Sequence, residues 1–246
     1  MTAVREVFDS IAYCKNVALC QHGDASHPCA TIVRSQHVSD NDFQLPEPWR
    51  GQIDKARILF LGSNPSIGDD RYALQTSTQE EVWESQQLAF GGGSRAYIVG
   101  GTKTTKPDGS PDRNVRYWSC IQARARELMP NAIPGQDYAI SEVVHCKSTE
   151  EEGVREAAQT CYDMHMAGVF SAAIAIVVVV LGKVARDRIL GANATVPPSP
   201  LKVELGNRMR TLLFLPHPND RGPKKSLAAH YSCADLDALR RLVDAP

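Results

Sequence analysis

Four short runs rich in Val, Ile and Leu constrain the fold of this chain more than any other feature of the sequence. They cover residues 57–61, 138–144, 175–181 and 211–215, and the third reads Ala-Ile-Val-Val-Val-Val-Leu. Continuous apolar runs of this length are typical of strands that are buried on both faces. Segments with helical periodicity lie between or beyond them, at 4–19, 78–89, 117–128, 151–166 and 235–243. The pattern therefore predicts an α/β fold, a three-layer α/β/α sandwich with a central four-stranded parallel sheet.

The length and charge of the chain limit what it can be. A chain of 246 residues, 43% of them hydrophobic, can bury one large core, so we expect a single domain covering residues 1–246. The formal net charge of −1 argues against a protein that coats nucleic acid through a general basic surface. Basic residues cluster at 113–126 and at 221–225, so any contact with nucleic acid must be local.

The termini and the apolar runs predict a cytoplasmic protein that does not enter a membrane. Residues 1–21 lack the basic start, apolar run and cleavage site of a signal peptide. The apolar run at 172–181 is far shorter than the roughly 20 residues that a membrane-spanning helix needs. Two segments are predicted to be irregular: 91–113, a mobile loop with the turn signature Pro-Asp-Gly at 107–109, and 191–200.

Two motifs follow the first and the fourth predicted strands. Residues 62–66 read Gly-Ser-Asn-Pro-Ser, and residues 216–219 read Pro-His-Pro-Asn. Each alone is an ordinary turn sequence, but ligands of parallel sheets bind beyond the carboxyl ends of strands. We therefore expect Asn64 and His217 to face the same crevice.

In these motifs the chain resembles the uracil-DNA glycosylase superfamily. The first motif of that superfamily is Gly-x-(Asp/Asn/Ala)-Pro-(Tyr/Gly) after a strand, and its mismatch-specific branch has Asn at the third place. The last motif of the superfamily is His-Pro-(Ser/Ala) or Asn-Pro-Ser. Residues 116–118, Arg-Tyr-Trp, are similar to the Asn-Arg-Phe-Trp of that branch. Residues 141–146, 161–162 and 181–185 are similar to the strand ending in Cys, the Cys-Pro-Tyr and the Leu-Gly-x-x-Ala of the iron–sulfur branches. The likeness runs in order from about residue 14 to residue 225.

The resemblance implies a monofunctional DNA-repair glycosylase that flips a damaged base into a pocket and hydrolyses its N-glycosidic bond. Asn64 would position the attacking water, and His217 with the backbone amide of Ser63 would donate to the base carbonyl. Arg221 would be the residue that wedges into the duplex, with Lys224 and Lys225 on phosphates. The remaining base-pocket residues that it implies are Gly62, Ser66, Asn219 and, as the stacking aromatic, Phe90, with Tyr72 and Tyr97 as alternatives.

Glu142 departs from the family pattern, because relatives place an asparagine amide there to read N3–H and O4 of uracil. A carboxylate would accept from N3–H but repel O4 unless burial keeps it protonated. The substrate is then uracil or another deaminated base, unless Glu142 turns away from the pocket and bonds a neighbour.

The seven cysteines are more consistent with binding a metal ion or a cluster than with disulfides, which are rare in a reducing cytoplasm. The resemblance implies a [4Fe–4S] cluster on Cys146, Cys161 and two of Cys14, Cys20 and Cys29, and we choose Cys20 and Cys29. Tetrahedral zinc on four thiolates is the alternative.

Two other functions compete with that of a glycosylase acting as a monomer on DNA. A non-catalytic or product-retaining binder of damaged DNA is suggested by an amide at 64 and an acid at 142. A small-molecule enzyme that uses residues 62–66 as a phosphate turn would be expected to show the Gly-x-Gly-x-x-Gly pattern, which is missing here.

Overall fold

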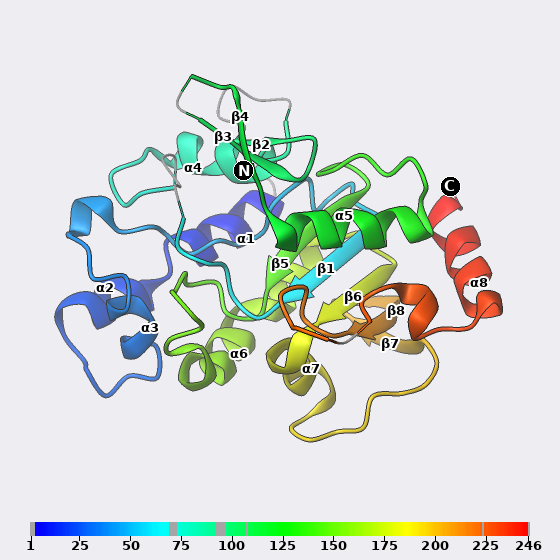
Figure 1. Cartoon of the computed structure of the whole chain (residues 1–246). Coiled ribbons are helices and arrows are strands. Elements are labelled where there is room, and N and C mark those ends of the chain that lie inside the picture. Colours follow the sequence, from blue (N-terminus) through cyan, green and yellow to red (C-terminus); the bar gives the residue numbers. More distant parts are fainter. Residues whose placement is uncertain (1–2, 69–72, 92–96, 107, 223, 246) are drawn as a thin grey trace.

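A five-stranded sheet forms the centre of the protein, seen in a computed structural model that describes residues 3–68, 73–91, 97–106, 108–222 and 224–245 (Figure 1). Its strand order is β5-β1-β6-β8-β7. The parallel strands are β5 (Tyr138–Glu142), β1 (Ile58–Gly62), β6 (Val177–Leu181) and β8 (Arg208–Leu215). These are the four predicted strands, and the predicted α/β class with its central parallel sheet is confirmed.

The fifth strand, β7 (Leu201–Leu205), pairs antiparallel with β8 and was not predicted. Gly206 and Asn207 join the two strands, both with left-handed φ of 59° and 60°. Such a two-residue turn matches the twist of a hairpin. β7 covers the edge of the sheet that β8 would otherwise expose.

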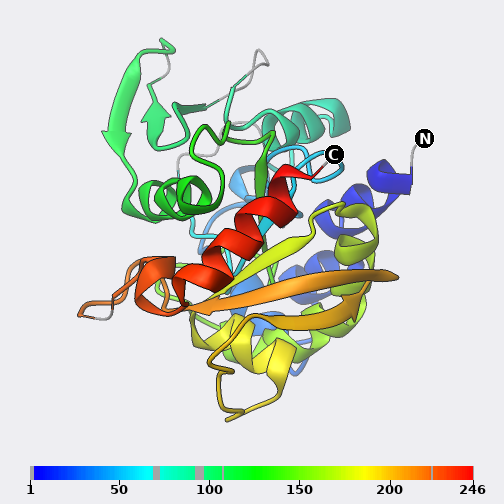
Figure 2. The same ribbon diagram turned by 90° about the vertical axis from the view of Figure 1, so that its right-hand side faces the viewer.

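Alternate residues of the parallel strands face two separate apolar cores. Leu59 and Leu61 of β1 pack with helices α1 (Ala3–Ala12), α2 (Lys15–His22), α3 (Ala30–Arg34), α4 (Gln79–Gln87), α6 (Val154–Ala172) and α7 (Gly182–Leu190). Ile58 and Phe60 face the other core, with α5 (Arg116–Leu128) and α8 (Cys233–Asp244). Figure 2 shows α8 on one side of the β7–β8 hairpin and α7 on the other. The three-layer arrangement follows from strands that are apolar on both faces.

The helices match most of the predicted segments. The segment at 4–19 is broken near Tyr13 into α1 and α2, and α6 starts three residues later than predicted and continues to Ala172. α4 begins with a capping box in which Thr78 and Glu81 bond each other's backbone N–H groups. In the part of the chain that is described, no helix combines the length and apolar character needed to cross a membrane.

The segment at 91–113 was predicted to be a loop, but part of it forms strands. Its described part forms a three-stranded antiparallel sheet of β2 (Ile98–Val99), β3 (Lys103–Thr105) and β4 (Pro111–Asn114). Asp108 and Gly109 lie in the connection between β3 and β4, with Gly109 at a φ of 81°. The last two residues of the predicted turn therefore lie between the two strands of a hairpin, and Pro107 lies outside the described residues. Short 3-10 helices at Asp40–Asp42 (η1) and Leu227–Ala229 (η2) complete the described elements.

The strand register brings the predicted motifs to one edge of the sheet. Gly62, the last residue of β1, pairs with Glu142, the last of β5, and Leu181 of β6 pairs with Leu215 of β8. The loops that follow these strands therefore leave the sheet side by side.

Candidate functional site

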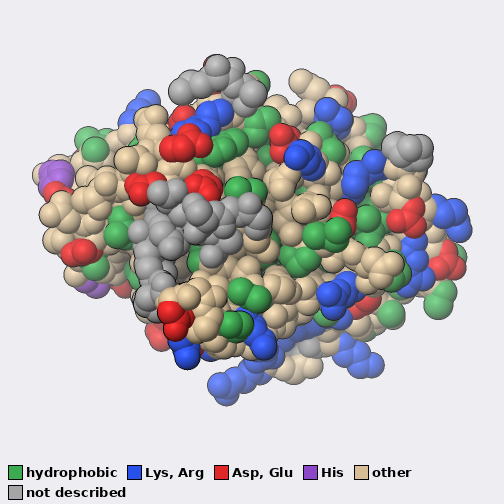
Figure 3. All heavy atoms as spheres, turned by 90° about the horizontal axis from the view of Figure 1, so that it is seen from above, with side chains coloured by type: hydrophobic (Ala, Val, Ile, Leu, Met, Phe, Trp, Pro, Cys, Tyr) green, Lys and Arg blue, Asp and Glu red, His purple; other side chains and the backbone are tan. Residues whose placement is uncertain are grey.

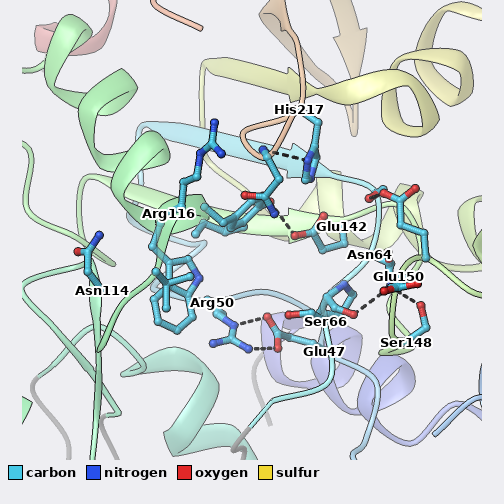
Figure 4. Close-up of a pocket in the computed structure, with 18 of the residues that line it drawn as sticks. Glu47, Arg50, Asn64, Ser66, Asn114, Arg116, Glu142, Ser148, Glu150 and His217 are labelled. Atoms are coloured by element: carbon cyan, nitrogen blue, oxygen red, sulfur yellow. Dashed lines mark hydrogen bonds and ion pairs between the residues drawn. The ribbon is translucent and has the colours of Figure 1, made fainter. Parts of the chain in front are cut away.

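A pocket of about 470 Å³ opens at the carboxyl ends of β1, β5 and β8. Figure 4 shows Glu142 in its middle, with His217 on one side and the Arg50–Glu47 pair on the other. Six of the predicted site residues line it: Ser63, Asn64, Ser66, Glu142, His217 and Asn219. The pocket is also lined by Glu47, Arg50, Arg113, Arg116, Tyr117, Trp118, Ser148, Glu150 and Glu151.

Asn64 is held by its amide nitrogen. Nδ2 donates to Ser148 Oγ at 2.9 Å and to the carbonyl of Pro65 at 2.9 Å. An isolated β-bridge between Ser66 and Ser148 also joins the loop after β1 to the loop after β5. Since both amide hydrogens are used, Oδ1 is the atom that can accept from a bound water.

His217 is fixed by the turn that follows it. Its backbone N–H donates to Asp220 Oδ2 at 3.1 Å, and its Nδ1 accepts from the N–H of Asn219 at 3.2 Å. Gly182 lies against the histidine, with a φ of 79°, and a Cβ there would come within 3.1 Å of His217 Cβ. Burial lowers the pKa of His217, so the ring is held neutral.

Glu142 and Tyr117 form a hydrogen-bonded pair at the base of the pocket. The Tyr117 hydroxyl donates to Glu142 Oε1 at 2.9 Å, and the Tyr117 ring lies 5.6 Å from that of His217, tilted by 32°. Glu142 is only 5% exposed, and its Oε2 has no hydrogen-bond partner among the described residues. Burial raises the pKa of Glu142 to about 8. Sequence reasoning noted Tyr117 within the motif but did not assign it to the pocket.

Two acidic residues after β5 also reach the pocket, and sequence reasoning did not place them there. Glu150 and Glu151 have left-handed φ values of 52° and 61°, which are unusual for residues other than glycine. Ser63 Oγ donates to Glu151 Oε1 at 2.8 Å. Strained backbone of this kind persists only where the surrounding structure holds it in place. It is found most often at functional sites.

A buried ion network lies on the side of the pocket opposite His217. Arg50 makes two hydrogen bonds to the carboxylate of Glu47, and Lys147 Nζ lies 3.7 Å from Glu47 Oε2. The Arg50 guanidinium also lies 5.4 Å from the ring centre of Trp118 and 5.0 Å from that of Tyr97. Through its contact with Trp118, Arg50 holds the start of α5, which forms one wall of the pocket.

Phe90 does not reach the pocket, and its assignment as the stacking aromatic is corrected. It is 9% exposed and packs on Tyr138 with a centroid distance of 5.9 Å, inside the core beneath α5. Of the two alternatives, Tyr97 packs against Trp118, and Tyr72 lies outside the described residues. Among the described residues, the Tyr, Trp and Phe side chains that line the pocket are Tyr117 and Trp118. Gly62 lies directly behind the pocket, where a Cβ would overlap Glu142 Oε2.

Basic side chains lie on one part of the pocket lining and on the loop after β8. Arg113 and Arg116 line it and are exposed, and Arg116 Nη2 donates to the carbonyl of Asp220 at 3.5 Å. Arg221 and Lys224 are exposed on the loop after β8, whereas Lys225 Nζ donates to the carbonyl of Asp220. Figure 3 shows Lys and Arg side chains gathered along its lower edge, the side that faces the viewer in Figure 1.

Four cysteines from distant parts of the chain line one buried cavity: Cys14, Cys29, Cys146 and Cys161. The predicted set had Cys20 in place of Cys14, but Cys20 is not among the cavity-lining residues. All seven cysteines are free thiols. Burial, with the neighbouring thiols, raises the pKa of Cys161 to about 12 and that of Cys29 to about 11.

The chemistry of this cavity suits a ligand that binds thiolates. Within the described ranges, no three His, Cys, Asp or Glu side chains converge on a point where one metal ion could bind, as a tetrahedral zinc site requires. An iron–sulfur cluster takes each thiolate on a different iron, so its ligands lie farther apart. The void between the thiols is only about 10 Å³, so their side chains must turn outward to admit a cluster. Four cysteines around one cavity are the donor set that such a cluster uses.

Comparison with models of known protein families and with curated proteins finds no match for this chain.

Proposed function

We propose that the protein removes uracil, or another deaminated base, from DNA by hydrolysing its N-glycosidic bond. The observation that carries the proposal is that Asn64 and His217, far apart in the sequence, line one pocket together with Glu142 and Tyr117. The resemblance of the two loop motifs to those of uracil-DNA glycosylases supports the same assignment.

The pocket suits a base that has been turned out of the DNA stack. Its volume of about 470 Å³ is at the small end of the range for ligand sites. An extruded base is read by hydrogen bonds to its edge and by stacking on an aromatic side chain. Tyr117 takes the stacking role in this proposal, because its ring lies beside His217 and lines the pocket.

His217 stabilises the departing base. As the glycosidic bond breaks, negative charge grows on the base carbonyl oxygens. Since Nδ1 of His217 accepts from Asn219, the hydrogen of the neutral ring sits on Nε2, where it is free to donate to such an oxygen. The backbone amide of Ser63 is the second donor in this proposal.

Asn64 and Glu151 act on the water and the sugar. Asn64 Oδ1 accepts from the attacking water and orients it, but an amide is too weak a base to take its proton. Among the described carboxylates that line the pocket, Glu47 is tied to Arg50 and Glu142 is buried; we choose Glu151 over Glu150 to take this proton, because Glu151 bonds Ser63, the neighbour of Asn64. Its negative charge also stabilises the cationic sugar.

DNA is held by local charge around the pocket. Arg113, Arg116, Lys224 and Lys225 contact phosphates, and Arg221 enters the duplex beside the extruded base. Because the overall charge is −1, binding depends on these few contacts and weakens with salt.

A [4Fe–4S] cluster on Cys14, Cys29, Cys146 and Cys161 completes the proposal. These residues belong to or flank α2, α3, β5 and α6. When bound, a cluster supplies a cross-link between these segments. That cross-link would also hold the loop between Cys146 and Cys161, which carries Ser148, Glu150 and Glu151.

The test is base release from labelled single- and double-stranded oligonucleotides that contain uracil, hypoxanthine, xanthine or a thymine mismatch, with DNA binding measured alongside. We expect release of at least one deaminated base by the wild type, reduced in Asn64→Ala. The amide at position 64 also favours a second candidate, a binder of damaged DNA. Tight binding to damaged DNA without release from any substrate would favour the binder and contradict the enzyme.

A further inference from the structure

The side-chain amide of Asn64 has two different ends, and only one of them can orient the attacking water. Oδ1 accepts a hydrogen from the water and leaves the lone pairs of the water oxygen free to attack the sugar. Nδ2 would instead donate to that oxygen and occupy one of its lone pairs. The surroundings of Asn64 must therefore select the orientation of the amide, because an amide that turned over would hold the water in the wrong way.

Two acceptors, one on each of two loops, hold the nitrogen end of this amide. Nδ2 of Asn64 donates to the carbonyl oxygen of Pro65 at 2.9 Å and to Ser148 Oγ at 2.9 Å (Figure 4). Oδ1 of Asn64 bonds no described residue and is not one of the buried unpaired atoms, so it is open to water in the pocket. Because a carbonyl oxygen can only accept, the nitrogen end is the one that must face Pro65.

Ser148 is connected to both acceptors. Its side chain is one of them, and its backbone N–H donates to the carbonyl of Pro65, which is the other, at 3.2 Å. The N–H of Ile67 in turn donates to the carbonyl of Ser148 at 3.4 Å, so the backbone of the two loops is joined on either side of Ser66. Ser148 is only 1% exposed, so bulk water does not compete for its hydroxyl group.

We propose that Ser148 is a positioning residue for base release, which holds the amide of Asn64 with Oδ1 toward the attacking water. This inference rests on the proposed function of the pocket. In this role Ser148 acts through Asn64 and contacts neither the water nor the DNA. A carboxylate at position 64 would need no such partner, because both of its oxygens accept. The serine is therefore a requirement of the amide that this chain carries at position 64.

The experiment is a double-mutant cycle on single-turnover uracil release. It compares wild type, Ser148→Ala, Asn64→Asp and the protein with both substitutions, with folding checked by circular dichroism. Ser148→Ala alone leaves one amide hydrogen of Asn64 without its partner, and release should fall by about tenfold or more. In the Asn64→Asp background the same change should cost less than about threefold, since either carboxylate oxygen can accept from the water.

A serine that only supports the fold would give a different result, because its loss would matter whatever residue stands at position 64. Equal losses from Ser148→Ala in the two backgrounds, or no loss in the wild-type background, would therefore overturn the inference. Ser85→Ala is the matched control, and it should release uracil as fast as wild type. Ser85 is equally buried, on α4, and its hydroxyl group donates to the carbonyl of Val82 within that helix.

A readout that needs no catalysis separates this inference from the proposed function. The two side-chain N–H signals of Asn64 in the NMR spectrum, assigned by their loss in Asn64→Asp, should exchange with solvent about tenfold faster in Ser148→Ala than in wild type. Unchanged exchange would contradict the inference even in an active enzyme. No base release from any substrate would contradict the proposed function, and the exchange rates would still decide whether Ser148 holds the amide.

Discussion

The Nδ1 atom of His217 accepts a hydrogen bond from the backbone N–H of Asn219, with the two nitrogens 3.2 Å apart. A ring nitrogen that accepts carries no hydrogen, so the neutral imidazole has its hydrogen on Nε2. Because burial lowers the pKa of His217, this form persists at physiological pH. The turn therefore prepares a hydrogen-bond donor before any ligand binds.

The first prediction concerns His217→Ala, which removes this donor. Loss of a donor to a developing anion typically costs about 10²–10³ in rate, and we expect a loss of that order for uracil release. The loss should be smaller for 5-fluorouracil, since its anion leaves more readily and needs less stabilisation. Single-turnover release from both bases measures this. His22→Ala, at an exposed histidine on α2, is the matched control; equal losses on both bases would show that His217 does not act on the leaving group.

The second prediction assigns the proton of the attacking water to Glu151. Glu151→Gln keeps the size of the side chain and its contact with Ser63, but removes its charge and basicity. General bases contribute about 10²–10⁴ to rates, so uracil release should fall by at least about a hundredfold. Glu152→Gln, at the next and exposed position, should behave as wild type. Equal activity of the two variants would remove Glu151 from the mechanism.

The third prediction separates Cys14 from Cys20. Cys14→Ala should lower the iron bound per chain and the visible absorption of anaerobically purified protein, because Cys14 lines the four-thiol cavity. Cys20→Ala should leave both unchanged, since Cys20, buried on α2, is not among the residues that line that cavity. The reverse result would restore the set expected from the sequence, and iron-free wild type would contradict the cluster.

The fourth prediction is a pH dependence of stability. Glu142 has a pKa of about 8 in the folded state and a normal, lower pKa when unfolded, so the folded state binds more protons between the two values. The contribution of Glu142 to the free energy of unfolding is therefore largest at acidic pH. It decreases as the pH rises toward 8, by up to about 1.4 kcal/mol per pH unit. Urea unfolding at several pH values measures this slope. Glu142→Gln should flatten it, and an identical slope in both proteins would show that Glu142 is ionised in the fold.

Much of the fold was predictable because its central strands are apolar on both faces. The run at 175–181 leaves no polar face to expose, so it must lie inside a covered sheet. β7 escaped prediction because its residues alternate between partly buried and exposed, as suits an edge strand. The signal that could have revealed it is Gly206-Asn207, a two-residue hairpin turn between alternating segments.

The pocket was predictable only in part. Asn64 and His217 follow strands directly, so the register of the parallel sheet places them together. Phe90 was expected at the pocket but lies in the core, and Tyr117 lines the pocket instead, because the long segment between β1 and β5 folds back through a second sheet that was not predicted. Glu151 was interpreted as a residue of the first turn of a helix, but α6 begins only at Val154, and the left-handed backbone before it turns Glu151 into the pocket.

The most direct test of this account is formation of abasic sites in a uracil-containing oligonucleotide by wild type and by the Asn64→Ala and His217→Ala variants, under single-turnover conditions. The account predicts strand cleavage after alkali treatment with the wild type and a large loss of it in both variants. Wild-type protein that leaves the oligonucleotide intact, or variants that cleave it as fast as the wild type, would contradict the claim that this pocket is a glycosylase active site.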